Sequence, residues 1–264
     1  MLKITNLNKT FHAGTVNEKK AIIDLSLTVN DGDFITIIGS NGAGKSTLLN
    51  LISGALPMDS GHVNLNGTDI TYQSEIKRAK RISRVFQDPM MGTAPDMWIE
   101  ENLALAYRRT GKHTLRWGIT KKERALYKET LSQLGLGLED RLNSSVGLLS
   151  GGQRQAVTLL MATLQKPELL LLDEHTAALD PKTAATVLSI TDKIVSEQNL
   201  TTLMVTHNMQ NAIDYGNRLI MMHNGGIIFD IAGEEKKQLT VETLLKKFEE
   251  ISGAEFANDR ALLS

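Results

Sequence analysis

The residues most able to do chemistry lie in one short segment, Gly39-Ser40-Asn41-Gly42-Ala43-Gly44-Lys45-Ser46-Thr47. Its spacing of glycines, lysine and hydroxyl residue fits the phosphate-binding loop pattern. Glycines let the backbone curl so that successive N–H groups point at phosphate oxygens without a side chain in the way. Lys45 supplies a charge near the β- and γ-phosphates, and the Ser46 hydroxyl is placed to bind Mg²⁺. The segment predicts an ATP site formed by all of Gly39–Thr47.

A second candidate site is the acidic pair Asp173-Glu174, which follows the apolar run Leu169–Leu172. Ligands of parallel α/β sheets bind at the carboxyl ends of the strands, where this pair is expected. Asp173 would bind Mg²⁺, directly or through water, and Glu174 would act as general base on an attacking water. An ordinary acidic strand end is the alternative for the pair alone. The phosphate loop elsewhere in the chain favours the catalytic interpretation.

The elements around the loop are those that a phosphate-binding loop needs, a strand before it and a helix after it. Residues 34–38 are a β-branched apolar run typical of a buried central strand. Residues 48–52 have helical character, and Gly54 is expected to end that helix. Alternating apolar residues near 2–7 and 22–29 predict two half-buried antiparallel strands.

The rest of the chain is expected to form an α/β core with a helical insertion. Strand character returns at residues 169–172, 201–206 and 219–222, and a hairpin turn follows at 224–226. Basic residues cluster before the signature described below, including Lys112 and Arg116, and a solvated helix face explains them without a binding role. We expect a single domain with these parts: a catalytic core at about 1–87 and 167–240, a helical subdomain at about 88–166 and a short amphipathic helix at about 241–252.

Composition excludes several classes of protein. The 264 residues are 41% hydrophobic and 22% charged, which predicts a packed globular core. A net charge of -1 disfavours a dedicated nucleic-acid binder. The absence of cysteine excludes disulfides and cysteine-ligated zinc or iron–sulfur sites. No signal peptide or run of roughly 18–20 apolar residues is present, so we expect a protein that is soluble by itself and reaches a membrane only through a partner.

One more motif, Leu149-Ser150-Gly151-Gly152-Gln153, matches the signature of ATP-binding cassette (ABC) ATPases. The order of motifs along nearly the whole chain also resembles that family: the phosphate loop, Gln87, the signature, Asp173-Glu174, Ala178-Leu179-Asp180 and His207. Six elements in this order and spacing are highly specific. The resemblance implies an α/β fold: a P-loop NTPase core with a mainly parallel sheet, an N-terminal antiparallel β subdomain and an inserted helical subdomain that carries the signature.

The resemblance also implies a role for each matched residue. Gln87 matches the glutamine that senses Mg²⁺ and the attacking water, and His207 matches the histidine that contacts the γ-phosphate. Phe11 matches the aromatic residue that stacks on adenine, with a core position as its alternative. The implied catalytic residues are Glu174, His207 and Gln87, and the implied Mg²⁺ ligands are Ser46, Gln87 and Asp173.

The signature implies that a second copy of the chain is needed. In the family Ser150, Gly151, Gly152 and Gln153 face an ATP held by the other subunit, so two copies pack head to tail around two ATPs. Asp180 matches the loop that crosses this interface. Two positions depart from the family pattern: His175 replaces the usual proline, and Met161-Ala162 replaces Arg-Ala. The first is expected to alter the loop beside Glu174, and neither removes a residue with a direct catalytic role.

Three kinds of ABC ATPase are candidates. A single small cassette is typical of the ATPase subunit of a bacterial importer, in which residues 89–98 would form the groove for a helix of the membrane subunit. Three methionines and Trp98 suit such docking, although Trp98 and Ile99 also fit a core. Iron–sulfur assembly or cell-division ATPases are the alternative. DNA-repair relatives carry coiled coils or zinc-binding cysteines and translation factors carry two cassettes, so no nucleic-acid partner is expected.

Within the importers, residues 173–181 and the basic segment before the signature resemble ATPases of the tryptophan/tyrosine-type uptake systems. Those ATPases work with a transmembrane permease and, indirectly, a substrate-binding lipoprotein. The resemblance implies a subunit on the cytoplasmic face of the membrane that powers import of a small solute such as an amino acid. Because the cassette does not touch the cargo, its residues do not encode the substrate.

Overall fold

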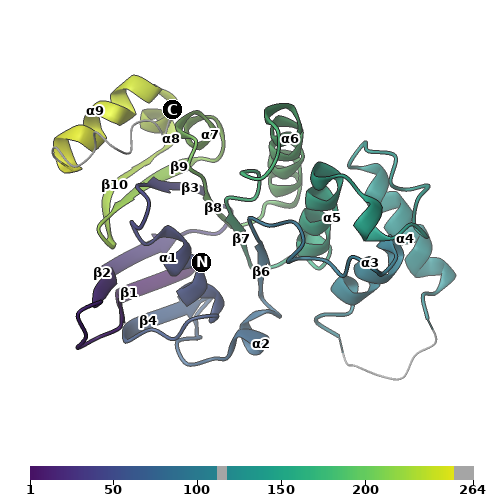
Figure 1. Cartoon of the computed structure of the whole chain (residues 1–264), viewed down its shortest axis with the longest axis horizontal. Helices are drawn as coiled ribbons and strands as arrows, with labels where there is room; N and C mark the ends of the chain where they lie inside the picture. Colours follow the sequence, from purple (N-terminus) through teal and green to yellow (C-terminus); the bar gives the residue numbers. More distant parts are fainter. Residues whose placement is uncertain (112–117, 253–264) are drawn as a thin grey trace. The chain divides into compact units, whose positions relative to one another are not determined.

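The structure is a computed structural model that describes residues 1–111 and 118–252. They form two compact units (Figure 1). Unit 1 contains residues 1–82 and the chain from 199 onward, and unit 2 contains residues 83–198. Unit 2 therefore includes a strand and a helix from beyond residue 166, in addition to the segment that the sequence predicts as a helical insertion. Lys112 and Arg116 lie outside the described residues.

Unit 1 contains an antiparallel sheet with strand order β2-β1-β4-β5. The strands are β1 (Leu2–Phe11), β2 (Lys19–Val29), β4 (Ser60–Leu65) and β5 (Thr68–Asp69). In the register Leu2 pairs with Val29, and Ile4 pairs with Leu27. These four side chains are buried because alternate residues of each strand point to the same face. The two antiparallel strands predicted from hydrophobic alternation are confirmed.

A second sheet in unit 1 contains the strand that leads into the phosphate loop. Its strands in spatial order are β10 (Gly226–Ala232), β9 (Arg218–His223), β3 (Phe34–Gly39) and β8 (Thr202–Val205). β3 runs parallel to both β8 and β9, and all 6 of its residues are buried. β9 and β10 form the antiparallel hairpin that the sequence predicts at Asn224–Gly226. A buried apolar strand flanked by parallel neighbours explains the continuous apolar run at 34–38.

Five helices of unit 1 follow the phosphate loop along the described chain. They are α1 (Lys45–Ser53), α2 (Glu75–Arg78), α7 (Met209–Asp214), α8 (Gly233–Lys237) and α9 (Val241–Ser252). Of these, α1, α7 and α8 contact the second sheet. α7 and α9 share an apolar cluster with β3 and β9, formed by Ile38, Met209, Ala212, Leu219, Met221, Leu244 and Phe248. The predicted C-terminal amphipathic helix is confirmed as α9, whose apolar face closes this cluster.

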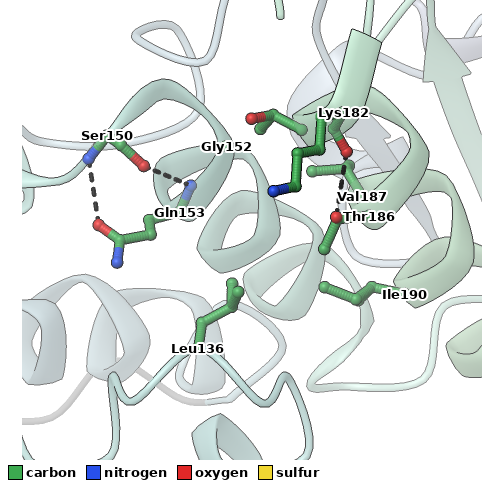
Figure 2. A pocket seen from close by; sticks show the side chains of 9 residues that line it. Leu136, Ser150, Gly152, Gln153, Lys182, Thr186, Val187 and Ile190 are labelled. Atoms are coloured by element: carbon green, nitrogen blue, oxygen red, sulfur yellow. Dashed lines mark hydrogen bonds between the residues drawn. The ribbon is translucent and has the colours of Figure 1, made fainter. Parts of the chain in front are cut away.

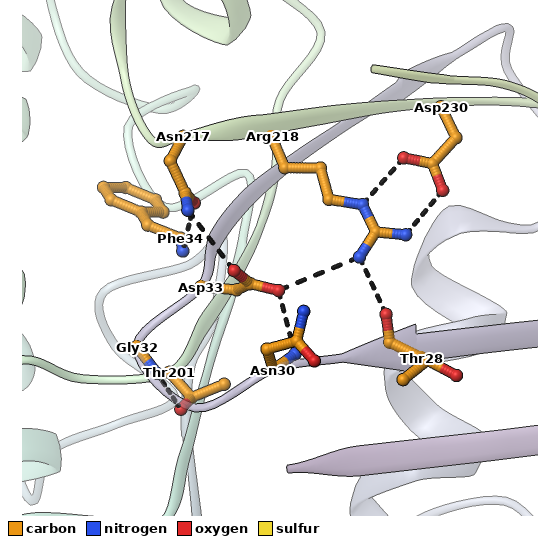
Figure 3. Close-up of polar contacts among 9 residues, drawn as sticks. All are labelled: Thr28, Asn30, Gly32, Asp33, Phe34, Thr201, Asn217, Arg218 and Asp230. Atoms are coloured by element: carbon orange, nitrogen blue, oxygen red, sulfur yellow. Dashed lines mark hydrogen bonds and ion pairs between the residues drawn. The ribbon is translucent and has the colours of Figure 1, made fainter. Parts of the chain in front are cut away.

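Polar contacts hold the turn that leads into β3 (Figure 3). The Arg218 guanidinium on β9 donates through Nε to Asp230 at 2.7 Å and through Nη1 to the carbonyl oxygen of Thr28 at 2.7 Å. Nη1 also lies 3.8 Å from Asp33 in the turn. Asn217 accepts a hydrogen bond from the first N–H of β3 at 2.8 Å. These contacts fix the start of β3. The phosphate loop, which follows the other end of β3, therefore extends from a rigid strand.

A buried cation caps the C-terminal end of α1. Arg78 is 3% exposed and donates through Nη1 to the carbonyl oxygens of Leu51 and Ile52, each at 2.8 Å. The last carbonyls of a helix lack intrahelical partners and carry partial negative charge, so a guanidinium there is favourable. Gly54 ends α1 with a φ of 83°, as the sequence predicts.

Unit 2 combines two neighbouring strands with a group of helices. The strands are β6 (Ile82–Val85) and β7 (Leu169–Asp173). The helices are α3 (Ile99–Tyr107), α4 (Lys121–Ser132), the short 3₁₀ helix η1 (Val146–Leu148), α5 (Gly151–Thr163) and α6 (Pro181–Gln198). α5 lies at the centre, in contact with α3, α4 and α6. Over the ranges that the structure describes, every helix is too short or too polar to span a bilayer.

Ion pairs join α3 to α4. Arg124 binds the Glu100 carboxylate through Nε at 2.6 Å and Nη2 at 2.7 Å, and Arg108 binds Glu123 at 2.9 Å. Glu100 is only 2% exposed, and a buried carboxylate is tolerated because it is paired. The first two lysines of α4 are exposed, as the solvated-face interpretation of this basic segment predicts.

Candidate nucleotide-binding site

The phosphate loop connects β3 to α1 in unit 1, as predicted. Gly39, Gly42 and Gly44 have φ values of 150°, 80° and 102°, which side-chain-bearing residues rarely adopt. A Cβ on Gly39 would lie 2.1 Å from the carbonyl oxygen of Met222, and one on Gly44 would lie 2.5 Å from that of Ala21. The glycines are therefore required twice, for the backbone curl and for the close approach of neighbouring strands.

Lys45 turns its side chain back into the loop. Its Nζ donates to the carbonyl oxygens of Gly39 at 2.7 Å and Ser40 at 3.1 Å, and the residue is 6% exposed. This buried ammonium group is held by backbone carbonyls in the loop. There it can offer a full positive charge to an oxygen of a bound phosphate. It is also the first residue of α1, whose N–H groups favour an anion. Ser46 follows on the exposed side of the same turn.

The β9–β10 hairpin supports the loop, a contact that sequence reasoning missed. The Gly225 N–H donates to the carbonyl oxygen of Ala43 at 3.1 Å, and the Ile23 N–H donates to that of Gly225 at 3.0 Å. The hairpin turn thus bridges the loop to β2. The Asn-Gly-Gly sequence predicts the turn, but nothing in it indicates the element that the turn touches.

His207 leaves the sheet at the same edge as the loop. The parallel register pairs Ile37 of β3 with Val205 of β8, and the Thr206 N–H donates to the Ile37 carbonyl oxygen at 3.1 Å. Gly39 and His207 each lie two residues beyond that pair, at the carboxyl ends of their strands. This is the edge at which parallel sheets bind ligands. His207 is exposed there.

Phe11 ends β1 and is half-buried. It pairs with Lys19 of β2, and a Cβ on Gly42 would lie 3.0 Å from the Lys19 ammonium nitrogen. The strand pair that carries Phe11 therefore reaches the phosphate loop. Its ring, which lies 5.8 Å from the Lys9 ammonium nitrogen, is not part of the closed core. The location fits an adenine-stacking residue better than the alternative of a core residue.

In unit 2, the acidic pair follows β7 as predicted. Asp173 is 8% exposed, and its Oδ2 accepts from Nη2 of Arg84 at 2.7 Å. The arginine compensates the negative charge of this buried carboxylate. Glu174 is half-buried and has a φ of 46°. Arg84 was missed by sequence reasoning, because an isolated arginine in a strand carries no positional signal.

Gln87 lies just beyond β6 and is exposed. The preceding residue, Phe86, accepts a hydrogen bond through its carbonyl oxygen from Nε2 of Gln155 at 3.2 Å. Gln155 is fully buried on α5, two positions after the signature. The structure therefore links the backbone at Gln87 to the signature helix within unit 2, a contact that the sequence does not indicate.

The signature forms the N-terminus of α5 and contains a capping box. The Ser150 hydroxyl accepts from the Gln153 N–H at 3.3 Å, and the Gln153 side chain accepts from the Ser150 N–H at 3.2 Å. The Ser150 hydroxyl hydrogen is not used in this cap, so it is available to an acceptor outside the helix. A Cβ on Gly152 would lie 2.1 Å from Cγ2 of Thr183, so this glycine permits the close contact of α5 with α6.

These residues line one end of a pocket of about 390 Å³ (Figure 2). Ser150, Gly152 and Gln153 lie on one side, and Lys182 of α6 lies on the other. The lining is completed by Leu136, Thr183, Thr186, Val187 and Ile190. A helix N-terminus, a hydroxyl and an ammonium group around one space form an environment suited to an anion. Sequence reasoning predicted the signature residues here but not Lys182.

Asp180 begins the turn into α6. It accepts from the Thr183 N–H at 3.1 Å, and Pro181 occupies the first helical position. Hydrogen bonds from Thr183 hold the pKa of the Asp180 carboxyl below its usual value, so the group is ionised near neutral pH. A Cβ on Gly151 would lie 3.2 Å from Leu179, so the signature and the predicted interface loop lie side by side.

Comparison with known proteins gives matches along most of the chain. Residues 22–177 match the family described as ABC transporter. A tyrosine transport ATP-binding protein of Clostridioides difficile (strain R20291) is 49% identical, over 94% of this chain and 99% of its own length. A phosphonates import ATP-binding protein of Ruegeria sp. (strain TM1040) is 36% identical, over 87% and 88%. A methionine import ATP-binding protein of Streptococcus agalactiae serotype III (strain NEM316) is 31% identical, over 91% and 68%.

Solved structures match at the level of the fold. A dimeric post-hydrolysis state of an ATP-binding cassette bound to ADP and Pi has a TM-score of 0.75 and 28% identity, covering 88% of this chain and 98% of its own. A nucleotide-free ATP-binding cassette from an ABC transporter has a TM-score of 0.76 and 28% identity, covering 96% and 97%. These matches confirm the expected fold class.

Replacing Gly44 by alanine tests whether the loop depends on close backbone approach. The new Cβ would meet the Ala21 carbonyl oxygen at 2.5 Å at a φ of 102°. We expect a loss of about 3 kcal/mol in the free energy of unfolding, from backbone strain plus overpacking, and at least about tenfold weaker ATP binding. Equilibrium urea unfolding and nucleotide titration measure the two effects.

Gly67→Ala is the matched control. Gly67 also has a positive φ, 76°, but a Cβ there would meet nothing within 4 Å. The control is expected to lose about 1 kcal/mol and to bind ATP normally, because only backbone strain is added. Equal losses at both positions would contradict the role of the close contact.

Proposed function

Because the chain belongs to the ABC transporter family, we propose that it is the ATP-binding and ATP-hydrolysing subunit that powers a membrane importer of a small solute such as an amino acid. One observation carries this proposal: a phosphate loop closed around Lys45 and a capped signature helix starting at Ser150 occur in the same chain. The relatives described above are named for uptake of tyrosine, phosphonates and methionine. None of these names favours an iron–sulfur assembly or cell-division ATPase.

ATP binds at the phosphate loop through all the residues of Gly39–Thr47. The Lys45 ammonium exchanges its carbonyl partners at the loop for oxygens of the β- and γ-phosphates, and the backbone N–H groups at the start of α1 supply further donors. Phe11 stacks on adenine. His207, which leaves the same sheet edge as the loop, contacts the γ-phosphate.

Mg²⁺ accompanies the nucleotide, and the proposed ligands offer the oxygen donors that this ion prefers. Ser46 is exposed at the start of α1, and the Asp173 carboxylate is held in place by Arg84. Bound Mg²⁺ neutralises charge on the β- and γ-phosphates. Within the described residues no cluster of three or more acidic or histidine side chains forms a separate metal site, so few protein ligands are expected. The proposed ligands are Ser46, Gln87 and Asp173.

Hydrolysis uses the residue that follows β7. Glu174 accepts a proton from the attacking water, whose oxygen bonds to the γ-phosphorus as the bond to the leaving ADP oxygen breaks. Gln87 orients this water. His207 stabilises the charge on the γ-phosphate. Glu174 suits the role because its half-buried carboxylate lies at the carboxyl end of a buried strand.

The signature acts on ATP bound to a second copy of this chain. The Ser150 hydroxyl hydrogen and the N-terminal N–H groups of α5 at Gly151 and Gly152 face its γ-phosphate, while Gln153 holds the cap through its own N–H and side chain. Asp180 lies in the loop that crosses the interface. Two copies therefore pack head to tail around two ATPs, and binding, hydrolysis and release close and reopen the pair.

Residues 89–98 form the proposed docking surface for a transmembrane permease. Met90, Met91 and Trp98 are 47%, 68% and 46% exposed, and flexible thioethers adapt to a partner helix. Trp98 is therefore exposed, as docking requires, while its neighbour Ile99 is fully buried and belongs to the core. Docking places the chain on the cytoplasmic face of the membrane, while a substrate-binding lipoprotein engages the permease on the other side.

Glu174→Gln tests the general-base assignment. The amide cannot accept the proton of the attacking water, so the rate of ATP hydrolysis is expected to fall at least about 100-fold while ATP affinity stays within about twofold. Glu197→Gln on the exposed side of α6 makes the same charge change and should leave the rate unchanged. Steady-state phosphate release and nucleotide titration measure both. Hydrolysis at the wild-type rate by Glu174→Gln would exclude this base.

Ser150→Arg tests the role of the signature across the dimer. The bulky side chain should abolish hydrolysis while nucleotide binding to the monomer is unchanged, because the serine faces the other copy's ATP. Ser150→Asp is the matched variant, since aspartate keeps the helix cap but repels phosphate. It should unfold like the wild type and also fail to hydrolyse ATP. Loss of monomeric nucleotide binding in both variants would place the signature at the chain's own ATP.

Met91→Asp tests the docking surface. Charge at this exposed position should abolish copurification with a co-expressed hydrophobic permease, while basal ATP hydrolysis by the isolated subunit stays within about twofold. Ile76→Asp is the control, because Ile76 is 80% exposed on α2, outside the proposed surface. Copurification that survives Met91→Asp, or is lost equally in both variants, would argue against docking at residues 89–98.

A further inference from the structure

The backbone at Glu174 adopts a conformation that few non-glycine residues take. Its φ of 46° lies in the left-handed region, where the Cβ of an L-residue crowds the following carbonyl. Such a conformation is strained and persists only where surrounding contacts impose it. Because Glu174 is the proposed base, the contacts that impose its backbone conformation also determine where its carboxylate lies.

The next residue, His175, is anchored deep in unit 2. It is 2% exposed, and its Nε2 lies 3.0 Å from Oγ1 of Thr191 on α6. Thr191 is itself 1% exposed. A buried imidazole N–H without a hydrogen-bond partner is destabilising, so this contact determines the position of the ring.

The direction of the hydrogen bond follows from the hydrogens available. Thr191 has one hydroxyl hydrogen and donates it to the carbonyl oxygen of Val187 at 2.8 Å. Its oxygen therefore accepts from Nε2–H of His175. Nε2 of His175 therefore carries a hydrogen, and this hydrogen lies on the line to Oγ1 of Thr191. One tautomer and one ring orientation satisfy the site.

We propose that His175 is a positioning residue for hydrolysis: its hydrogen bond to Thr191 anchors the backbone next to Glu174 and holds the Glu174 carboxylate in line with the attacking water. The inference rests on the proposed function, in which Glu174 is the base. A proline at position 175, usual among ABC ATPases, restricts the preceding residue by direct steric contact. Proline would favour an extended backbone at that residue, whereas Glu174 here has a φ of 46°, and a tertiary hydrogen bond to α6 holds the backbone instead.

The anchor lies on the helix that begins at the predicted interface loop. Asp180 caps α6 by accepting from the Thr183 N–H, and Thr191 lies further along the same helix. The start of α6 therefore holds the predicted interface loop, and the middle of α6, at Thr191, holds the residue that follows Glu174. A displacement of α6 would move both of these segments. The position of the Glu174 carboxylate therefore depends on the position of α6.

Thr191→Val tests the anchor, because it removes the acceptor while keeping the shape of the buried side chain. We expect the turnover number of the full chain to fall on the order of 10- to 100-fold, since small misplacements of a catalytic group have effects of this size. ATP affinity should stay within about twofold, since the phosphate loop is untouched. Thr191→Ser retains the hydroxyl and should restore turnover to within about threefold of wild type.

His175 is tested from its own side of the bond. His175→Gln keeps an N–H donor at similar reach and should retain more turnover than His175→Leu, which keeps bulk but has no donor. Combining Thr191→Val with Glu174→Gln should reduce the residual rate no further, because the anchor acts only through the carboxylate. If His175→Leu fails to fold, the Thr191 pair still decides the question.

Two results would overturn the inference. Turnover within about twofold of wild type in Thr191→Val, with only the free energy of unfolding reduced, would make the bond purely structural. Parallel losses of turnover and ATP affinity would indicate general damage to the fold. Wild-type hydrolysis by Glu174→Gln would instead show that Glu174 is not the general base. Failure of the proposed function is therefore distinguished from failure of the anchor.

Discussion

Unit 1 depends on one constraint: at glycines of the phosphate loop, the backbone lies so close to neighbouring strands that no side chain would fit. At Gly39 and Gly44 the phosphate loop touches carbonyl oxygens of β9 and β2, so its shape is set by strands from both sheets. The Gly225 turn adds a hydrogen bond to the loop, and Arg78 fixes the far end of α1. ATP recognition is thus a property of the whole α/β unit, because the loop has no freedom to adopt its curl independently of these neighbours.

In unit 2 the same side chains stabilise the fold and carry the chemistry. Ser150 caps α5 with its oxygen, and the hydrogen that remains is the one available to a phosphate. Arg84 fixes the position of the Asp173 carboxylate, which is also a proposed Mg²⁺ ligand. A substitution at Ser150 therefore changes helix stability and ligand contact together, and the two effects separate only in variants that keep the cap.

Much of the fold follows from the sequence, because contiguous patterns predict it. The alternation in β1, the apolar run of β3, the Gly54 helix end and the Asn224–Gly226 turn are local signals, and the structure contains each one. What could not be predicted depends on contacts between distant positions. The pairs Arg84–Asp173 and Gln155–Phe86 join positions that are 89 and 69 residues apart in the chain. The sequence singles out Asp173 as a candidate ligand, but nothing in the segment around Arg84 or Phe86 indicates the partner that each one meets.

The buried pair of His175 and Thr191 restricts how this sequence can change over evolutionary time. Loss of the hydroxyl at 191 leaves an imidazole N–H unpaired in the interior, and an apolar residue at 175 leaves only the threonine's own helix carbonyl as a partner for its hydroxyl. Position 191 is therefore free to lose its hydroxyl only after the imidazole at 175 has been replaced. Homologous chains with histidine after the catalytic glutamate should therefore retain serine or threonine at the α6 position, and those with proline should accept aliphatic residues there.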